Sequence, residues 1–341
     1  MRARVRAAAR LVALAAACAP PAAGTVAPAA APPGGGRALF ELRNELWYNL
    51  DNFLYHAARA RRRLPNEYSW ADSAARGDTA GYGALAPEER EGWERALAHY
   101  VAERAGRPID FDSGLVATSF ALSGRGEAPL APGEGLSPAL VRALEDAAPA
   151  YRRLWWPRHR AANEAHAARL APLLARHGDA LARGLARAYR APWPSAPPIV
   201  QLTPYANWAG AYTLLDPTLI TVSSLYRGSR GTLGLELLFH EQSHAMMDSV
   251  SAALDRAGLP RGSRAAREVE HWIIFYTAGE VTRRAVPGHT TFAEWRGLWQ
   301  LRGFDRVRRL LDASWKPYLD GRAPFGEALA ELVRAYGAAV R

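Results

Sequence analysis

Apolar residues recur at intervals of three and four along most of the chain, a spacing that predicts helices with one buried face. Between residues 37 and 63, this spacing runs through Leu39, Leu42, Leu46 and Leu50. Similar spacing, bounded by proline or glycine, indicates further helices near residues 87–106, 137–156, 263–286, 304–315 and 323–340. The stretch 157–190 carries it over an unusual length and reads as one long helix, or as two broken near Pro172 and Gly178.

Two segments differ from this helical pattern. Residues 107–135 read as irregular, with short strands. Residues 197–224 are rich in β-branched and aromatic side chains and carry turn signals at Pro204, Gly210 and Asp216-Pro217, so they predict two or three strands. The expected fold class is α+β: mainly helical, with a small β-sheet just before the apolar segment 235–250.

Composition divides the chain into four regions. Residues 1–24 run from arginines through a short apolar run to small residues, the shape of a secretory signal peptide or lipoprotein leader. Residues 25–36, rich in alanine, proline and glycine, predict a flexible tether. Residues 37–190 are expected to form a helical N-terminal region, and residues 191–341 the region that carries the chemistry.

Cys18 is the only cysteine, so no internal disulfide is expected. Its context, LAAAC, resembles a lipobox, although Leu14 lies four rather than three positions before the cysteine. Lipidation of Cys18 would anchor the chain to a membrane, whereas cleavage after Gly24 would discard the cysteine. Either outcome exports the chain, so we expect it in the periplasm or cell envelope, or secreted.

The charge of the chain is positive but spread out. Four arginines of the leader contribute to the net charge of +10, which leaves six positive charges on the remainder, distributed along many helices. A dispersed excess of arginine is typical of a solvated surface rather than of a nucleic-acid site. We therefore expect no nucleic-acid partner.

The segment LELLFHEQSHAMMDSV places ligand-capable side chains inside apolar sequence. Leucines, a phenylalanine and methionines surround nearly the whole helical circumference, which predicts a buried helix. His240 and His244 are four positions apart and share one face, with Glu241 beside them. This is the H-E-x-x-H pattern, in which two imidazoles bind zinc and the glutamate is the general base. The pattern predicts one zinc ion, and two satisfied core histidines are the alternative.

A catalytic zinc site needs a third protein ligand and one open position. The next predicted helix, REVEHWIIFYTAGEVTRR, is the natural source, because the intervening residues let it turn back antiparallel to the motif helix. Glu280 is the preferred ligand, since Ala278 and Gly279 allow close approach of the helices. His271 is the alternative; it lies nine positions earlier, about half a helical circumference away, so both cannot easily face one ion.

The motif HEQSH, with strands before it and a glutamate-bearing helix after it, resembles the zincin metallopeptidases, and the gluzincins in particular. This resemblance implies His240, His244 and Glu280 as zinc ligands and Glu241 as general base. It covers about residues 198 to 285; over its whole length the chain resembles a family of exported bacterial proteins. The metzincin pattern is absent, because Val250 stands where that family has a third histidine.

The resemblance also implies that an edge strand beside the motif helix holds the substrate backbone. Asn207, Trp208 and Tyr212 are the candidate substrate-binding residues, and ordinary aromatic packing in a strand is the alternative. His271, Tyr276 and Tyr212 are candidates for stabilising the oxyanion. The other histidines are expected at the surface or at helix caps: His56, His99, His159, His166, His177 and His289.

The sequence thus predicts an exported zinc hydrolase, most simply a metallopeptidase acting on a peptide or protein substrate. A zinc hydrolase of non-peptide amides would use the same water chemistry. The alternative of a different class is a non-catalytic envelope protein, a scaffold or binding module with a structural zinc site or none. A closed set of four ligands would favour that alternative, and an open coordination position would favour the enzyme.

Overall fold

The computed structural model describes residues 38–64, 78, 80–207, 209–301 and 303–340. The expected leader, the tether, Cys18 and Trp208 lie outside the described residues. The chain forms two compact units. The helical unit holds Leu173–Ala196 and the chain from Thr232 onward, and the sheet unit holds the described chain up to Pro172 together with Pro197–Gly231. This division differs from the boundary expected near residue 190, because the strands that follow it belong with the N-terminal helices.

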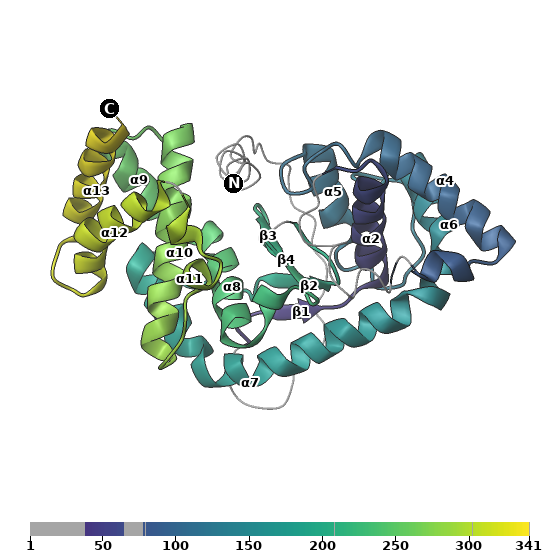
Figure 1. Cartoon of the computed structure of the whole chain (residues 1–341), viewed down its shortest axis with the longest axis horizontal. Coiled ribbons are helices and arrows are strands. Elements are labelled where there is room, and N and C mark those ends of the chain that lie inside the picture. Colours follow the sequence, from purple (N-terminus) through teal and green to yellow (C-terminus); the bar gives the residue numbers. More distant parts are fainter. Residues whose placement is uncertain (1–37, 65–77, 79, 208, 302, 341) are drawn as a thin grey trace. The chain divides into compact units, whose positions relative to one another are not determined.

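The sheet unit is organised on a four-stranded mixed sheet with the order β1-β2-β4-β3. Its strands are β1 (Glu41–Arg43), β2 (Ile199–Thr203), β3 (Ala211–Leu214) and β4 (Leu219–Ser223). β2 pairs in parallel with β1 and β4, while β3 is an antiparallel edge strand (Figure 1). The expectation of two or three strands in 197–224 is thereby confirmed, with three strands present, and so is the mainly α fold with a small sheet.

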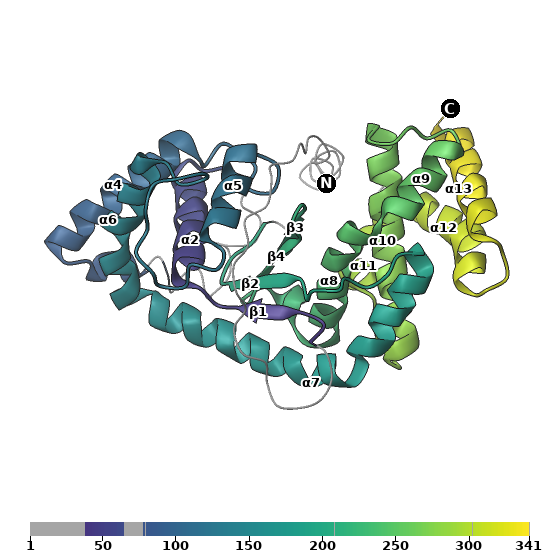
Figure 2. The ribbon, with the colours of Figure 1, turned by 180° about the vertical axis from the view of Figure 1, so that it is seen from behind.

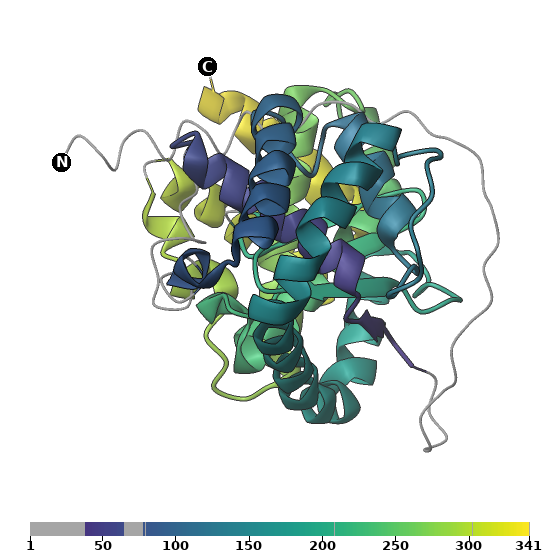
Figure 3. The ribbon, with the colours of Figure 1, turned by 90° about the vertical axis from the view of Figure 1, so that its right-hand side faces the viewer.

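Helix α2 (Leu46–Arg61) is the centre of this unit and is buried from Leu46 to Ala58. It packs against β2 and against the pair α4 (Pro87–Glu103) and α6 (Pro138–Leu154), which run side by side (Figures 1 and 3). The buried carboxylate of Asp51 on α2 is satisfied inside the core: it accepts from the Tyr100 hydroxyl at 2.6 Å and from Arg104 at 3.0 Å.

Two sequence expectations in this unit are corrected. The helix expected from residue 37 begins only at Leu46, because residues 41–43 pair with β2 instead. The segment 107–135, expected to be irregular, contains helix α5 (Ser113–Leu122). The carboxylate of Asp112 caps α5 by accepting from the backbone N–H groups of Gly114 and Leu115, and such a cap stabilises a helix start by about 1 kcal/mol.

Several histidines expected at the surface are core residues. His159 is 1% exposed, with its Nδ1 3.0 Å from the Tyr151 hydroxyl and its Nε2 3.0 Å from Asp78. His166 is 2% exposed. Burial, reinforced by Arg158, lowers the pKa of His159 to about 3, and burial with Arg169 and Arg230 nearby lowers the pKa of His166 to about 4. Both imidazoles are therefore neutral in the folded protein at pH 7. His56 and His289 are also buried, which leaves His99 and His177 as partly exposed members of the group.

The buried histidines predict acid lability. The folded-state pKa of His166 lies below its ordinary value of 6.5. The stability that the folded protein gains from keeping this imidazole neutral is therefore complete above pH 6.5 and is lost as the pH falls toward 4. Between pH 7 and pH 5, protonation of His166 in the unfolded chain lowers the free energy of unfolding by about 2 kcal/mol. We expect His166→Phe to remove about that much of the pH dependence in urea unfolding of the metal-free protein, with His177→Phe as the control. An unchanged pH dependence in His166→Phe would contradict this.

Helix α7 (Trp156–Tyr189) runs without interruption through Pro172, so the single-helix alternative for residues 157–190 is confirmed. Its last residues belong to the helical unit.

The other elements of the helical unit are α8 (Gly231–Ser243), α9 (Asp248–Arg256), α10 (Arg264–Ala285), α11 (Phe292–Trp295), α12 (Phe304–Leu319) and α13 (Phe325–Val340). Within it, α9, α11 and α12 pack on α10, and α13 packs on both α9 and α12 (Figure 2). Among the described helices, none has the length and apolarity needed to span a membrane.

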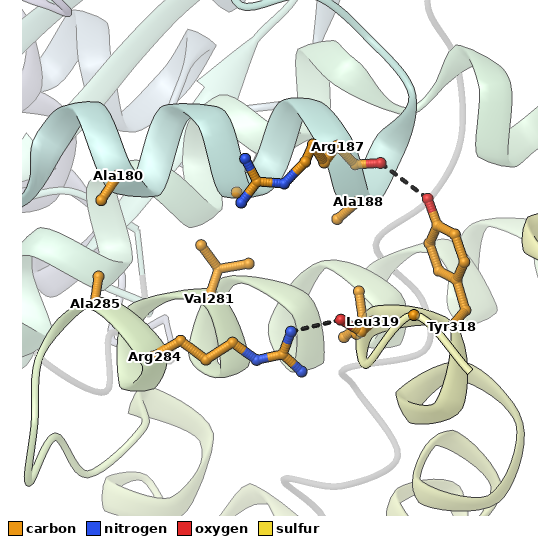
Figure 4. A pocket seen from close by; sticks show the side chains of 10 residues that line it. Ala180, Arg187, Ala188, Val281, Arg284, Ala285, Tyr318 and Leu319 are labelled. Atoms are coloured by element: carbon orange, nitrogen blue, oxygen red, sulfur yellow. Dashed lines mark hydrogen bonds between the residues drawn. The ribbon is translucent and has the colours of Figure 1, made fainter. Parts of the chain in front are cut away.

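The contact of α7 with α10 depends on small side chains. A Cβ atom at Gly184 would lie 2.5 Å from Cγ1 of Val281, so only glycine allows this approach. A cavity of about 460 Å³ lies beside it, between α7, α10 and the end of α12 (Figure 4). The Tyr318 hydroxyl donates to the Arg187 carbonyl at 2.9 Å, and Arg284 donates to the Leu319 carbonyl and pairs with Asp320. These bonds tie α12 to the two helices at the cavity rim.

Candidate metal centre

His240 and Glu241 of the H-E-x-x-H motif lie on helix α8, whose burial the sequence predicts correctly, and His244 follows directly after its last residue. Every residue from Gly234 to Ser243 is buried. The helix is shorter than the apolar segment, because α8 ends at Ser243 and His244–Met246 continue as a 3₁₀ turn before α9. His244 stays beside His240 across this change of helix type, with ring centroids 5.3 Å apart.

His271 of α10 joins the two motif histidines. Its ring centroid lies 5.5 Å from that of His240 and 5.3 Å from that of His244, so the three imidazoles form a nearly equilateral triangle. One ring nitrogen of each lies within 4.8 Å of those of the other two. Among the described residues, this is the group of histidine, cysteine and acidic side chains that could hold a metal ion.

The antiparallel relation of α8 and α10, expected from the sequence, explains the triangle. Three pairs of facing residues, which we call rungs, connect the helices. Their residue numbers fall along one helix as they rise along the other. His244 lies against His271, His240 lies 4.3 Å from the ring of Phe275, and Glu236 lies where a Cβ atom at Gly279 would be 3.3 Å from its Oε1. Positions on each helix are four residues apart, so each set forms one stripe on its helix surface.

The electrostatics of the triangle favour metal binding. Burial, together with the other two imidazoles, lowers the pKa of His240 well below its ordinary value. Burial and the neighbouring His271 lower the pKa of His244 to about 3, and burial lowers that of His271 to about 4. A metal ligand must be a neutral imidazole, and all three are neutral at pH 7, so protons do not compete for the site.

The surroundings of the triangle are apolar on one side and accessible on another. Phe275 lies 4.3 Å from the His240 ring and 4.7 Å from the His271 ring, so its phenyl group forms a wall beside two of the imidazoles. His240 is buried, whereas His244 and His271 are half-buried. Solvent therefore reaches part of the group.

Glu280, the preferred third ligand in the sequence analysis, lies outside the triangle. Its carboxylate is 3.4 Å from Nζ of Lys316 and 3.7 Å from Arg283. Glu280 lies nine positions after His271, and that spacing along a helix turns the two side chains to different faces. The structure thus brings the alternative, His271, to the motif histidines, and it joins Glu280 to the cations of α10 and α12.

Tyr276 is engaged elsewhere as well. Its hydroxyl donates to Oδ1 of Asp312 on α12 at 2.5 Å, and burial followed by this bond raises its pKa. It lies on α10 but off the stripe formed by His271, Phe275 and Gly279. Its hydroxyl is therefore held by α12, and the oxyanion role stays a prediction.

The candidate substrate-binding residues are part of the sheet unit. Tyr212 is on the edge strand β3, as a β-augmentation site requires, but its side chain is 4% exposed and packs in the core. Asn207 donates to Asp110 at 3.1 Å and accepts from the backbone N–H of Ala209. Both side chains thus serve the local fold, and their substrate-binding role stays a prediction.

Glu241 is 4% exposed and follows His240 directly on α8. On a helix its side chain is turned by about 100° from that of His240, so it lies beside the ligand stripe rather than on it. A buried carboxylate at this position matches the place of the general base in the H-E-x-x-H pattern.

Three residues around the triangle went unrecognised in the sequence: Phe275, Glu236 and His289. Phe275 and Glu236 share a detectable signal, since each lies four residues, about one helical turn, from a metal-ligand candidate. His289 offered no such signal, because it comes from the loop after α10. It binds Glu236, with Nε2 2.5 Å from Oε2. Burial raises the pKa of Glu236, and the hydrogen bonds from His289 and from the backbone N–H of Phe292 oppose that rise.

Comparisons of the chain with protein-family models, with curated proteins and with solved structures find no match. The class of site is therefore defined by its own geometry. Three neutral, converging imidazoles on two antiparallel helices form a group that could bind one metal ion.

Proposed function

We propose that the protein is a zinc-dependent hydrolase, and that its substrate is a peptide or protein. The observation that carries the proposal is the triangle of His240, His244 and His271 with Glu241 next to it in the chain. Three imidazoles suit zinc, and a set of three protein ligands is typical of catalytic zinc sites. The peptidase assignment within the hydrolases rests on the resemblance of HEQSH to the zincin motif.

The number of ligands favours an enzyme over a structural site. Structural zinc sites are closed by four protein ligands, usually with cysteine among them. In the described part of the chain the group has three members and no fourth, and two of the three histidines are half-buried. A position open to water and substrate is what a catalytic site requires, so the scaffold or binding-module alternative has less support.

The roles of the residues follow from their chemistry. The three histidines hold the ion, and zinc bound there would acidify a water molecule and polarise a substrate carbonyl. Glu241 accepts a proton from the attacking water and donates it to the leaving amine. Phe275 excludes water from one side of the imidazoles, which strengthens electrostatic interactions at the site.

The direct test combines metal content with hydrolysis in one preparation. The mature chain is loaded with zinc, its bound metal is counted by elemental analysis, and a mixed peptide library is digested and read by mass spectrometry. We expect about one zinc per chain and specific cleavages that a chelator stops. Full zinc occupancy without hydrolysis of any peptide would instead support a structural or binding role.

The proposed export has its own test, at Cys18. If Cys18 carries lipid, the expressed protein partitions with membranes, and Cys18→Ser releases it to the soluble fraction because the anchor is lost. Mass spectrometry of the mature N-terminus provides the check. A mature chain that begins at Thr25 would show that the cysteine is removed with the leader.

A further inference from the structure

The third rung between α8 and α10 contains a buried carboxylate that the proposed chemistry does not use. Glu236 is 1% exposed and lies one turn before His240 on α8. It accepts from the backbone N–H of Phe292 at 2.8 Å and lies 2.5 Å from Nε2 of His289. The other nitrogen of His289 is 2.9 Å from the Thr232 hydroxyl at the start of α8. One carboxylate thus connects the motif helix to the loop that follows α10.

On α10, close packing at Gly279 constrains the position of the helix. A Cβ atom at Gly279 would lie 2.8 Å from Cγ2 of Thr291 and 3.3 Å from Oε1 of Glu236. A separation below 3.0 Å is not tolerated without movement, so α10 packs here only because residue 279 is glycine. The hydrogen bonds on one side and the glycine contact on the other fix how α8 and α10 lie relative to each other.

We propose that Glu236 is a positioning residue for the metal centre, which holds α8 and α10 in the register that brings His271 to His240 and His244. The residue pairs 236/279, 240/275 and 244/271 belong to one pair of antiparallel helices, so a slip at the first pair displaces the last. This inference rests on the metal-binding part of the proposed function and does not depend on the substrate.

The test measures metal affinity and coordination in variants of the full mature chain. Glu236→Met removes the acceptor and leaves the N–H groups of His289 and Phe292 buried without it. We expect its affinity for Zn²⁺, measured by chelator competition, to fall by about tenfold or more, the range found for outer partners of metal ligands. The visible absorption of the Co²⁺-loaded protein should change shape, because that spectrum reports ligand geometry. Glu236→Gln keeps an acceptor oxygen and should restore most of the affinity.

A second variant approaches the same rung from α10. Gly279→Ala leaves Glu236 intact but pushes α10 away from Thr291, so we expect a similar loss of affinity. If Glu236→Met does not fold, Gly279→Ala provides the test in its place. Gly337→Ala is the matched control, because a Cβ atom at that helical glycine would meet nothing within 4 Å.

A control for general destabilisation comes from the sheet unit. Asp51 is also a buried carboxylate, 2% exposed and paired with Arg104. We expect Asp51→Asn to lower the melting temperature and to leave Zn²⁺ affinity and the Co²⁺ spectrum unchanged. Parent-like affinity and spectrum in both Glu236→Met and Gly279→Ala would overturn the positioning role while leaving the metal centre in place. A parent chain that binds neither metal would overturn the metal centre and this role together.

Discussion

Replacing His240 or His271 by alanine is expected to abolish stoichiometric zinc binding. Zinc binds protein sites with apparent free energies of about 10 to 16 kcal/mol, shared among the ligands, so losing one of three should lower affinity by more than about a hundredfold. His271→Ala is the more informative variant, because it separates the triangle from a site completed by Glu280. The measurement is zinc per chain after equilibration with a weak chelator, followed by the dissociation constant from competition.

Two controls accompany the histidine variants. Glu280→Gln should keep parent-like affinity, because its carboxylate pairs with Lys316 and Arg283 instead of lying with the imidazoles. His177→Ala removes a histidine of the same unit that is not in the group. If zinc were lost from Glu280→Gln and retained in His271→Ala, the ligand set would be that of the gluzincin resemblance, and the triangle would be refuted.

Glu241→Gln is expected to lower peptide hydrolysis by a hundredfold or more while leaving zinc content unchanged. Glutamine keeps the shape and hydrogen-bonding capacity of the side chain but cannot accept the proton of the attacking water, and general acid–base catalysis contributes about 10² to 10⁴ in rate. The rate should be measured on one cleaved peptide of the library at saturating zinc.

The matched control for this variant is Glu270→Gln, a partly buried glutamate beside His271 in the chain that is no member of the metal group. It should retain most of the activity. Parent-level hydrolysis by zinc-loaded Glu241→Gln would show that another group is the general base, or that the activity comes from elsewhere.

Much of the architecture is encoded locally and could be predicted. Helical spacing located α4, α6, α7, α10, α12 and α13, because an amphipathic helix needs a repeating apolar face wherever it packs. The strands of 197–224 were visible in their β-branched residues and turns. Local signals failed at Glu41–Arg43, where pairing with a distant strand overrides helical spacing, and at α5, whose Asp112 cap lay in a segment read as irregular.

The metal group could be predicted from the sequence only in part. His240, Glu241 and His244 are four or fewer residues apart, so α8 and the 3₁₀ turn that continues it place them together, and the motif alone identifies them. The third ligand comes from another helix, and its identity depends on which face of α10 meets α8. The sequence permits both Glu280 and His271, which point to opposite sides of one helix. Only the packed structure selects His271, because the contacts of Gly279 with Glu236 and Thr291 fix the rotation and register of α10.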